Sequence, residues 1–233
     1  MNELFLGRLF AYSILPLLLA TGHMLLDRQA RTPSRRIELF MIYLFAISVG
    51  ANGIGGAFGH LFLSDQISEG IGWAAGSPFQ LEMGYANLLI GVLGLVAIGK
   101  RDGFRTATII ATAILGFGAT IVHLQDIAAH GNLAPGNTIQ NIGNLLDPLL
   151  LIGLTWLSTR LADPDGESPV FLRWQERQQP IAAWSAAGVG TGFAIGYYSG
   201  GIFLWTIIAT LVSVGIGFVF SKQMAQREEA APV

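Results

Sequence analysis

Four ionisable side chains fall where apolar segments of the chain begin or end, and these groups are the best suited to chemistry. His60 and His123 close two such segments, Glu82 opens another, and Asp147 lies about two turns inside a fourth. Imidazoles and carboxylates in apolar surroundings bind protons, cations and small polar solutes, and they are costly to keep there without a function. We therefore expect these four residues, together with Asn144, to converge on one ligand or proton site.

The segment from His123 to His130 has the spacing best suited to a metal ion. If a helix continues through it, His123, Asp126 and His130 fall within about 60° of arc on one face. Such ligands suit divalent ions of Zn, Fe, Mn or Cu, and Glu82 or His60 from a neighbouring helix would complete the shell. The opposing interpretation is that these histidines hydrogen-bond to headgroups, water or backbone. Another alternative is haem b held axially by His60 and His123, although both residues are close to the expected interface.

A polar stripe accompanies Asp147, because Asn141 and Asn144 precede it at intervals of three residues. Pro148 follows directly and cannot donate a backbone hydrogen bond to the carbonyl of Asn144. The stripe predicts either a hydrated or ligand-lined cavity, or a proline kink whose free carbonyl is satisfied by a neighbouring helix. Two other polar residues, Gln80 and Asn137, follow helix-start patterns, so we expect them to serve as helix caps.

The elements that must position these residues are membrane-spanning helices. Of the 233 residues 52% are hydrophobic and only 12% are charged, which is too apolar for a typical soluble domain. A helix of roughly 20 residues crosses about 30 Å of hydrocarbon. We predict an all-α, polytopic transmembrane helical bundle that forms a single domain over residues 1–220, with a polar tail at 221–233. The seven predicted spans cover residues 4–26, 37–62, 80–98, 106–123, 139–159, 180–198 and 201–220.

Basic residues predict the orientation of these spans, because Lys and Arg are retained on the cytoplasmic side. Twelve of the 13 basic residues fall in the loops and the tail on one side of the bundle. The exception is Arg8, which is expected to snorkel to the outer interface. The opposite loops, 63–79 and 124–138, contain no basic residue. The N-terminus is therefore predicted to lie outside and the C-terminus in the cytoplasm, with the polar cluster in the outer half.

A repeat of small residues predicts how the helices pack. Gly188, Gly192 and Gly196 share one face of the sixth predicted span, and such seams let helix backbones approach closely in a bilayer. The seam would face another helix of the chain, a second copy or a partner subunit. Nucleic acid is excluded as a partner because the net charge is -2 and no basic run exists, and the lack of Cys excludes disulfides and thiolate metal sites.

Several strings between Gly55 and Leu154 resemble those of a family of small, uncharacterised prokaryotic multi-pass membrane proteins. The strings are Gly59-His60-Leu61-Phe62, Ile71-Gly72-Trp73-Ala74-Ala75-Gly76-Ser77-Pro78-Phe79-Gln80-Leu81-Glu82, Ala86-Asn87-Leu88 and Gly131-Asn132-Leu133-Ala134-Pro135-Gly136-Asn137. The resemblance implies a multi-pass protein of the cell (inner) membrane and directs attention to the outer face, but it implies no mechanism.

Three classes of function fit these observations. The first is a small transporter or channel-like protein, or an accessory to one, that handles a proton, metal ion or small solute at the outer-half site. The second is a membrane metalloenzyme or haem protein that uses the same histidines and carboxylates. The third is a structural subunit or assembly factor that needs no site and contacts its partner through the glycine seam.

Overall fold

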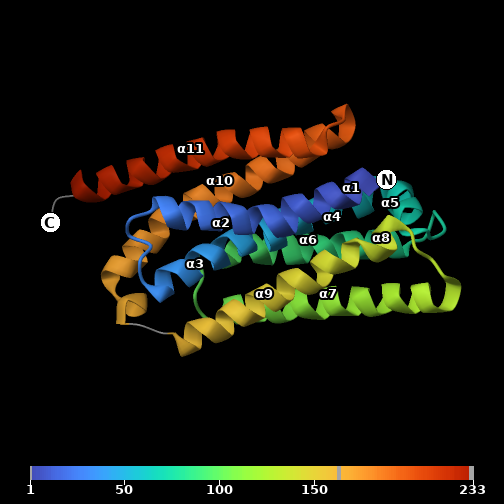
Figure 1. Ribbon diagram of the computed structural model, residues 1–233, viewed down its shortest axis with the longest axis horizontal. Coiled ribbons are helices and arrows are strands. Elements are labelled where there is room, and N and C mark those ends of the chain that lie inside the picture. The colour runs from blue at the N-terminus through green and yellow to red at the C-terminus, as the bar shows by residue number, and fades with distance from the viewer. Residues whose placement is uncertain (1, 162–163, 231–233) are drawn as a thin grey trace.

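Helices make up nearly all of the structure. A computed structural model describes residues 2–161 and 164–230, and this part of the chain contains no strand. The long helices lie side by side along the longest axis of the molecule (Figure 1). The fold is therefore a helical bundle, which agrees with the predicted all-α class.

The first two long rods of the bundle each contain a π-helical stretch. The first rod is α1 (Asn2–Leu9), η1 (Phe10–Ile14) and α2 (Leu15–Leu26); the second is α3 (Pro33–Tyr43), η2 (Leu44–Ala51) and α4 (Asn52–Phe62). The remaining elements are α5 (Ser64–Ile71), α6 (Phe79–Ala97), α7 (Gly103–His130), α8 (Pro135–Thr138), α9 (Gln140–Arg160), η3 (Pro164–Glu167), α10 (Pro169–Ser199) and α11 (Ile202–Ala230).

Six helical stretches are long and apolar enough to cross a membrane. They are Glu3–Leu26, Pro33–Phe62, Phe79–Ala97, Gly103–His130, Pro135–Arg160 and Ile202–Arg227. Each overlaps one predicted span, but the predicted span at 180–198 is not among them. It forms the second half of α10, whose glycines contribute little hydropathy, and the helix begins before the predicted span, at Pro169, and continues through Pro180.

Several helices extend beyond the predicted limits. The second rod begins at Pro33, where the Thr32 side chain accepts a hydrogen bond from the Arg35 amide and caps the helix. At the other extreme, α11 continues to Ala230, so the described part of the expected tail is helical. Where the sequence predicted only a loop, the chain forms the amphipathic helix α5.

Glycines set which helices touch. A Cβ built on Gly53 of α4 would lie 2.5 Å from the Gly91 nitrogen of α6, so only glycine permits this approach. Similarly, a Cβ on Gly116 of α7 would lie 2.5 Å from the Asn144 carbonyl oxygen of α9. These glycines therefore place α6 closely against α4 and α7 closely against α9.

The predicted glycine seam packs α10 against α11. A Cβ on Gly188 would lie 2.7 Å from the Ala209 carbonyl oxygen, and one on Gly196 would lie 2.5 Å from the Ile202 Cα. The two helices lie together along one side of the bundle (Figure 1) and turn at Gly200 and Gly201, both with positive φ. The seam is thus filled by α11 of the same chain, which leaves this face no room for a partner subunit.

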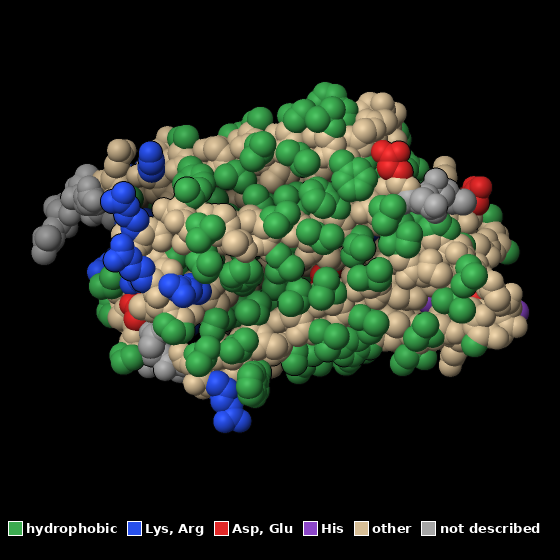
Figure 2. Space-filling model, viewed as in Figure 1, with side chains coloured by type: hydrophobic (Ala, Val, Ile, Leu, Met, Phe, Trp, Pro, Cys, Tyr) green, Lys and Arg blue, Asp and Glu red, His purple; other side chains and the backbone are tan. Residues whose placement is uncertain are grey.

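Charged residues lie at the ends of the bundle (Figure 2). Lys and Arg gather at one end, which we call the basic end, and the other end holds the N-terminus, α5 and α8. We call this second end the α5/α8 end. Large apolar side chains cover the surface between the two ends, as expected for a surface that faces lipid.

Candidate functional site

A cavity of about 380 Å³ lies within the bundle, in the half nearer the α5/α8 end. Four of the five residues that the sequence predicted for a ligand or proton site line it: His60, His123, Asn144 and Asp147. They come from α4, α7 and α9. Glu82 is exposed and does not line the cavity, because it lies on the outward face of the first turn of α6.

The carboxyl group of Asp147 is buried in the wall of this cavity and is only partly hydrogen-bonded. Its Oδ2 accepts a hydrogen bond from the Ser13 hydroxyl at 3.1 Å, whereas its Oδ1 has no partner in the described structure. The Ser48 hydroxyl, also in the wall, likewise has none. The two residues are only 5% and 4% exposed. A buried polar atom left without a partner costs about 1–3 kcal/mol, so each of these two atoms would be stabilised by a hydrogen-bonding group in the cavity.

The π-helical stretches explain how two serines reach this point. Ser13 lies in η1 and Ser48 in η2, so each belongs to a wider turn within an otherwise α-helical rod. Such turns shift side chains from the faces they would occupy in a regular α-helix, and they are frequent at functional sites. Neither serine was predicted as a site residue, because nothing in the sequence reports a π turn.

Arg8 is a cavity residue that the sequence analysis placed wrongly at the outer interface. Its Nε and Nη2 donate hydrogen bonds to the Asn52 Oδ1 at 3.2 and 3.0 Å, and the half-buried guanidinium attracts Asp147 electrostatically. The cation therefore turns inward to polar groups of two other helices. The signal for this was present, since a cation inside an apolar segment usually faces the bundle interior.

The ring of His60 is held by Gln80. The His60 Nδ1 lies 2.6 Å from the Gln80 Oε1, and the Gln80 Nε2 donates to the Ser68 hydroxyl at 2.9 Å. With the Gln80 amide in this orientation, its oxygen accepts from the Nδ1, and the Nε2 of a neutral ring remains an acceptor. The prediction of Gln80 as a capping residue was wrong: α6 has no side-chain cap and Gln80 is buried.

A longer network fixes His123 in the same way. Its Nδ1 donates to the Asn137 Oδ1 at 2.6 Å, because the amide nitrogen of Asn137 donates to the Asp126 Oδ2 at 3.1 Å and to the Asn132 carbonyl at 2.8 Å. The carboxylate thus determines which way the amide points, and the amide determines which ring nitrogen is protonated. Asn137 is fully buried within α8 and is not the predicted cap of α9.

Trp73 completes this arrangement. Its indole stacks on the His123 ring at 5.3 Å between centroids, while its Nε1 donates to the Asp126 Oδ2 at 2.8 Å. The Asn132 amide donates to the same oxygen at 2.7 Å. Asp126 therefore anchors the loop after α7 and holds the imidazole of His123 in a fixed orientation.

The predicted metal ligands are partly separated by this network. Asp126 and His130 do meet, since the His130 Nδ1 lies 2.8 Å from the Asp126 Oδ1 one helical turn away. The His123 Nδ1 instead bonds to Asn137, and residues 2–161 and 164–230 contain no group of three or more His, Asp or Glu placed to hold a metal ion. The side-chain amides of Asn132 and Asn137 donate to the Asp126 carboxylate, which the helical spacing had predicted as a metal ligand.

The polar stripe of α9 shows both features that its sequence allowed. Asn144 and Asp147 line the cavity, whereas the buried Asn141 donates from its amide to the Asn137 carbonyl at 2.9 Å. The Asn144 carbonyl, which Pro148 cannot engage, packs against Gly116 of α7. The free carbonyl is therefore placed at the contact between α7 and α9, in the wall of the cavity.

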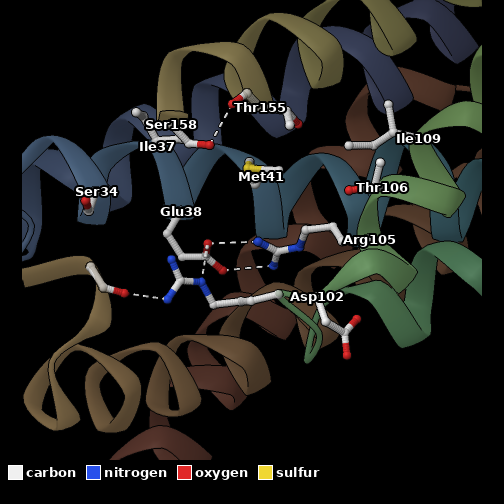
Figure 3. A pocket seen from close by; sticks show the side chains of 12 residues that line it. Ser34, Ile37, Glu38, Met41, Asp102, Arg105, Thr106, Ile109, Thr155 and Ser158 are labelled. Carbon is white, nitrogen blue, oxygen red and sulfur yellow. Dashed lines mark hydrogen bonds and ion pairs between the residues drawn. The ribbon is translucent and has the colours of Figure 1, made fainter. Parts of the chain in front are cut away.

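A second polar cluster lies at the basic end. Glu38 of α3 is buried and accepts two hydrogen bonds from the Arg105 guanidinium, both at 2.9 Å (Figure 3). It also accepts one from the Gln175 amide at 2.7 Å. Arg101 lies 3.8 Å from the same carboxylate and donates to the Gly166 carbonyl. These contacts join α3, the loop between α6 and α7, η3 and α10 beside a cavity of about 250 Å³.

A second ion pair extends this cluster. Arg35 donates from its Nε and Nη2 to the two carboxylate oxygens of Asp165, at 2.7 and 2.9 Å. This guanidinium holds the pKa of Asp165 below its ordinary value, against a smaller opposing effect of partial burial. This cluster was not predicted from the sequence, although a glutamate at the start of an apolar span was a signal for it.

The fold and this interior polarity fit an integral membrane protein of the helical-bundle class. The chain belongs to DUF6790, a family of unknown function, whose match covers residues 9–164. The match includes the predicted site residues but ends before α10 and α11. No curated protein and no solved structure matches the chain.

Proposed function

We propose that this protein binds a small solute or a proton in its membrane-embedded cavity and handles it as a transporter, a channel-like protein or an accessory to one. The observation that carries this proposal is the pair of unpartnered buried atoms, Asp147 Oδ1 and Ser48 Oγ, in the wall of one cavity. The volume of about 380 Å³ is within the range of small-molecule sites.

The orientation of the two histidines supports binding. Because both Nδ1 atoms donate to amide oxygens, the His60 and His123 rings each retain an Nε2 acceptor, and both rings line the cavity. A bound group that carries a proton would therefore find acceptors on Asp147 and on the imidazoles. Arg8 supplies a nearby cation that limits the cost of an ionised Asp147.

We propose seven spans in the cell (inner) membrane, with the N-terminus outside and the cavity in the outer half. The gathering of Lys and Arg at one end supports this orientation (Figure 2), and the apolar half of α10 pairs with α11 as the remaining span. Reporter fusions after residue 233 and within 28–32 test it. Activity of either reporter on the outside would place the cavity in the cytoplasmic half.

Binding is tested with purified protein in proteoliposomes that contain a pH-sensitive dye. An imposed membrane potential should drive proton uptake, or a thermal-shift screen with Na⁺, K⁺, Zn²⁺, ammonium, acetate and phosphate should give a stabilising ligand. Asp147→Asn should abolish the effect, whereas Glu82→Gln should retain it as the matched change outside the cavity. If wild type and both variants show neither proton uptake nor stabilisation, the proposal is wrong.

A metal ion at His60 and His123 is the second candidate. Metal-binding histidines commonly donate the other ring N–H to a carbonyl oxygen, which is how both Nδ1 atoms are arranged. Metal analysis and a visible spectrum of the purified protein separate the outcomes. A stoichiometric metal that is lost in His123→Ala supports this candidate, a Soret band supports haem b, and a colourless, metal-free protein that retains the Asp147-dependent effect excludes both.

A further inference from the structure

The cavity has an open side between α6 and α7. Part of its wall on α7 consists of Ile114, Gly118 and Val122, which are four residues apart and therefore share one face of the helix. All three are exposed, with 69% of Ile114 accessible. On α6 the wall includes Phe79 and Met83, and Phe79 is also exposed. The cavity therefore communicates with the outer surface of the bundle along these two helices.

The glycine contacts explain why this side is open. Gly53 and Gly91 hold α6 against α4, while Gly116 holds α7 against the Asn144 carbonyl of α9. These two helices are joined by the short loop 98–102 at the basic end, whereas the cavity lies toward the α5/α8 end. Thus α6 packs against α4 and α7 packs against α9, and side chains line the space between α6 and α7.

The opening faces the lipid-covered surface and not the end of the bundle. Ile114 and Gly118 lie near the middle of α7, at a depth that the hydrocarbon would occupy. At the α5/α8 end, the cavity is bounded by Ile67, Ile71 and Trp73 from α5 and the loop after it. A molecule dissolved in the bilayer therefore has a more direct route to Asp147 than a molecule in water.

Polar and apolar residues occupy different parts of the cavity wall. The groups farthest from the opening are polar and belong to η2, α4 and α9, among them Ser48, Asn52 and Asp147. The groups at the opening are apolar. The polar part contains one acidic and one basic side chain, Asp147 and Arg8, so it does not require a head of strong net charge.

We propose that the ligand is a membrane-dissolved amphiphile with a small hydroxyl-bearing head, which reaches the cavity sideways between α6 and α7. Its hydroxyl group would donate to the Asp147 Oδ1 and accept from the Ser48 hydroxyl, the two atoms without partners. Its apolar chain would lie along Met83 and Gly118, toward the lipid. This inference rests on the proposed function and names the class of molecule that the cavity binds.

Photolabelling in phosphatidylcholine liposomes tests the inference. The probe is a dodecanol derivative with a diazirine in its chain, and mass spectrometry should locate its adducts on the cavity faces of α6 and α7. Excess dodecanol should compete, whereas butanol should not. Asp147→Leu should also reduce labelling, because it removes the acceptor for the hydroxyl group.

Gly118→Phe should close the opening and reduce cavity labelling by at least about tenfold, equivalent to about 1.4 kcal/mol of binding free energy. A Cβ on Gly118 meets nothing within 4 Å, so the helix tolerates the substitution. Gly190→Phe is the matched control, because Gly190 has the same free space on α10 away from the cavity. This control should label like the wild type.

Two outcomes overturn the inference. Either labelling is equal in wild type and Gly118→Phe, or butanol competes as well as dodecanol. If the Asp147-dependent proton or solute effect persists in either case, the proposed function stands and only the class of ligand is wrong. If that effect is absent as well, both proposals fail.

Discussion

Ser13 of η1 donates a hydrogen bond to Asp147 of α9 over 3.1 Å, and it thereby joins the first rod of the bundle to the helix that carries the most buried acid of the cavity. This serine is the only described side chain that hydrogen-bonds to the carboxyl group of Asp147. The position of the acid in the cavity therefore depends on a residue 134 positions earlier in the chain.

Ser13→Ala should lower the free energy of unfolding by about 1–3 kcal/mol, because it leaves a buried carboxyl group with no partner. Thermal unfolding of the purified protein measures the change. Ser13→Ala combined with Asp147→Leu should recover much of the loss, since no unpaired polar group then remains. A double variant less stable than the sum of the single changes would contradict this account.

Asp126→Asn should release His123 from its fixed tautomer. Trp73, Asn132 and Asn137 all donate to the single Oδ2 of Asp126, and an asparagine offers them a neutral carbonyl oxygen in place of a charged carboxylate, so the amide of Asn137 is held less firmly in one orientation. Nitrogen NMR of histidine-labelled protein should show a proton on Nδ1 in the wild type and a tautomer mixture in the variant. Glu69→Gln, an exposed change at the same end, should leave the His123 signals unchanged.

Glu38→Ala should cost about 3–5 kcal/mol of stability, because it leaves the buried Arg105 guanidinium without its carboxylate. Glu38→Met combined with Arg105→Leu should be less destabilising than Glu38→Ala alone, since neither charge is then buried unpaired. Thermal unfolding of Glu38→Met, Arg105→Leu and the double variant forms the cycle. Additive losses would show that the two side chains are not coupled in the folded state.

Stability should fall in acid through the Arg35–Asp165 ion pair. The folded-state pKa of Asp165 lies below its ordinary value of 3.8. The stability that the ion pair contributes is therefore fully present above pH 3.8, and it is lost as the pH falls through the folded-state pKa. Asp165→Asn should therefore make the unfolding temperature less dependent on pH in this range. Because Asp165 is partly exposed, raised salt should weaken the contribution in the wild type. Equal acid sensitivity in wild type and variant would exclude the pair as its source.

Gly192→Leu should separate α10 from α11, because a side chain there would overlap the backbone of Trp205 and Thr206. Overpacking costs typically about 1–3 kcal/mol, and a collision with backbone belongs at the upper end. Gly190→Leu on the opposite side of the same turn meets no atom within 4 Å and is the control. Unfolding temperatures of the two variants should differ clearly, and equal values would show that the seam does not determine the pairing.

The position of Asp147, His60 and His123 in the wall of an interior cavity could be predicted from the sequence, because an ionisable group in an apolar segment has few structural explanations. Gln80 and Asn137 were misjudged for the opposite reason. Each follows a helix-start pattern that explains it locally, and only the tertiary structure shows that their amides turn inward to His60 and His123. A local motif predicts the backbone conformation around a residue, but it does not predict which distant side chain will hydrogen-bond to that residue.

The two serines near Asp147 and the opening between α6 and α7 could not be predicted from the sequence. Ser48 reaches the cavity wall and Ser13 reaches the carboxyl group of Asp147 from π turns, which leave no compositional trace. The opening depends on which helices the glycines draw together, and the spacing of Gly53 or Gly116 does not say which neighbour each will meet. The approximate positions of the six long apolar helices follow from hydropathy, whereas the choice of neighbouring helix follows from side-chain fit.

The contact between Arg8 and Asn52 has a consequence for how the chain is inserted during synthesis. An arginine inside a lone spanning helix costs up to about 2.5–3.5 kcal/mol, the value at the helix centre, and Arg8 lies between the start and the centre of the first rod. Asn52, which accepts from the Nε and the Nη2 of Arg8, becomes available only when the second rod has been made. We therefore expect the first two rods to insert as a helical hairpin, in which Asn52 of the second rod stabilises the guanidinium of the first.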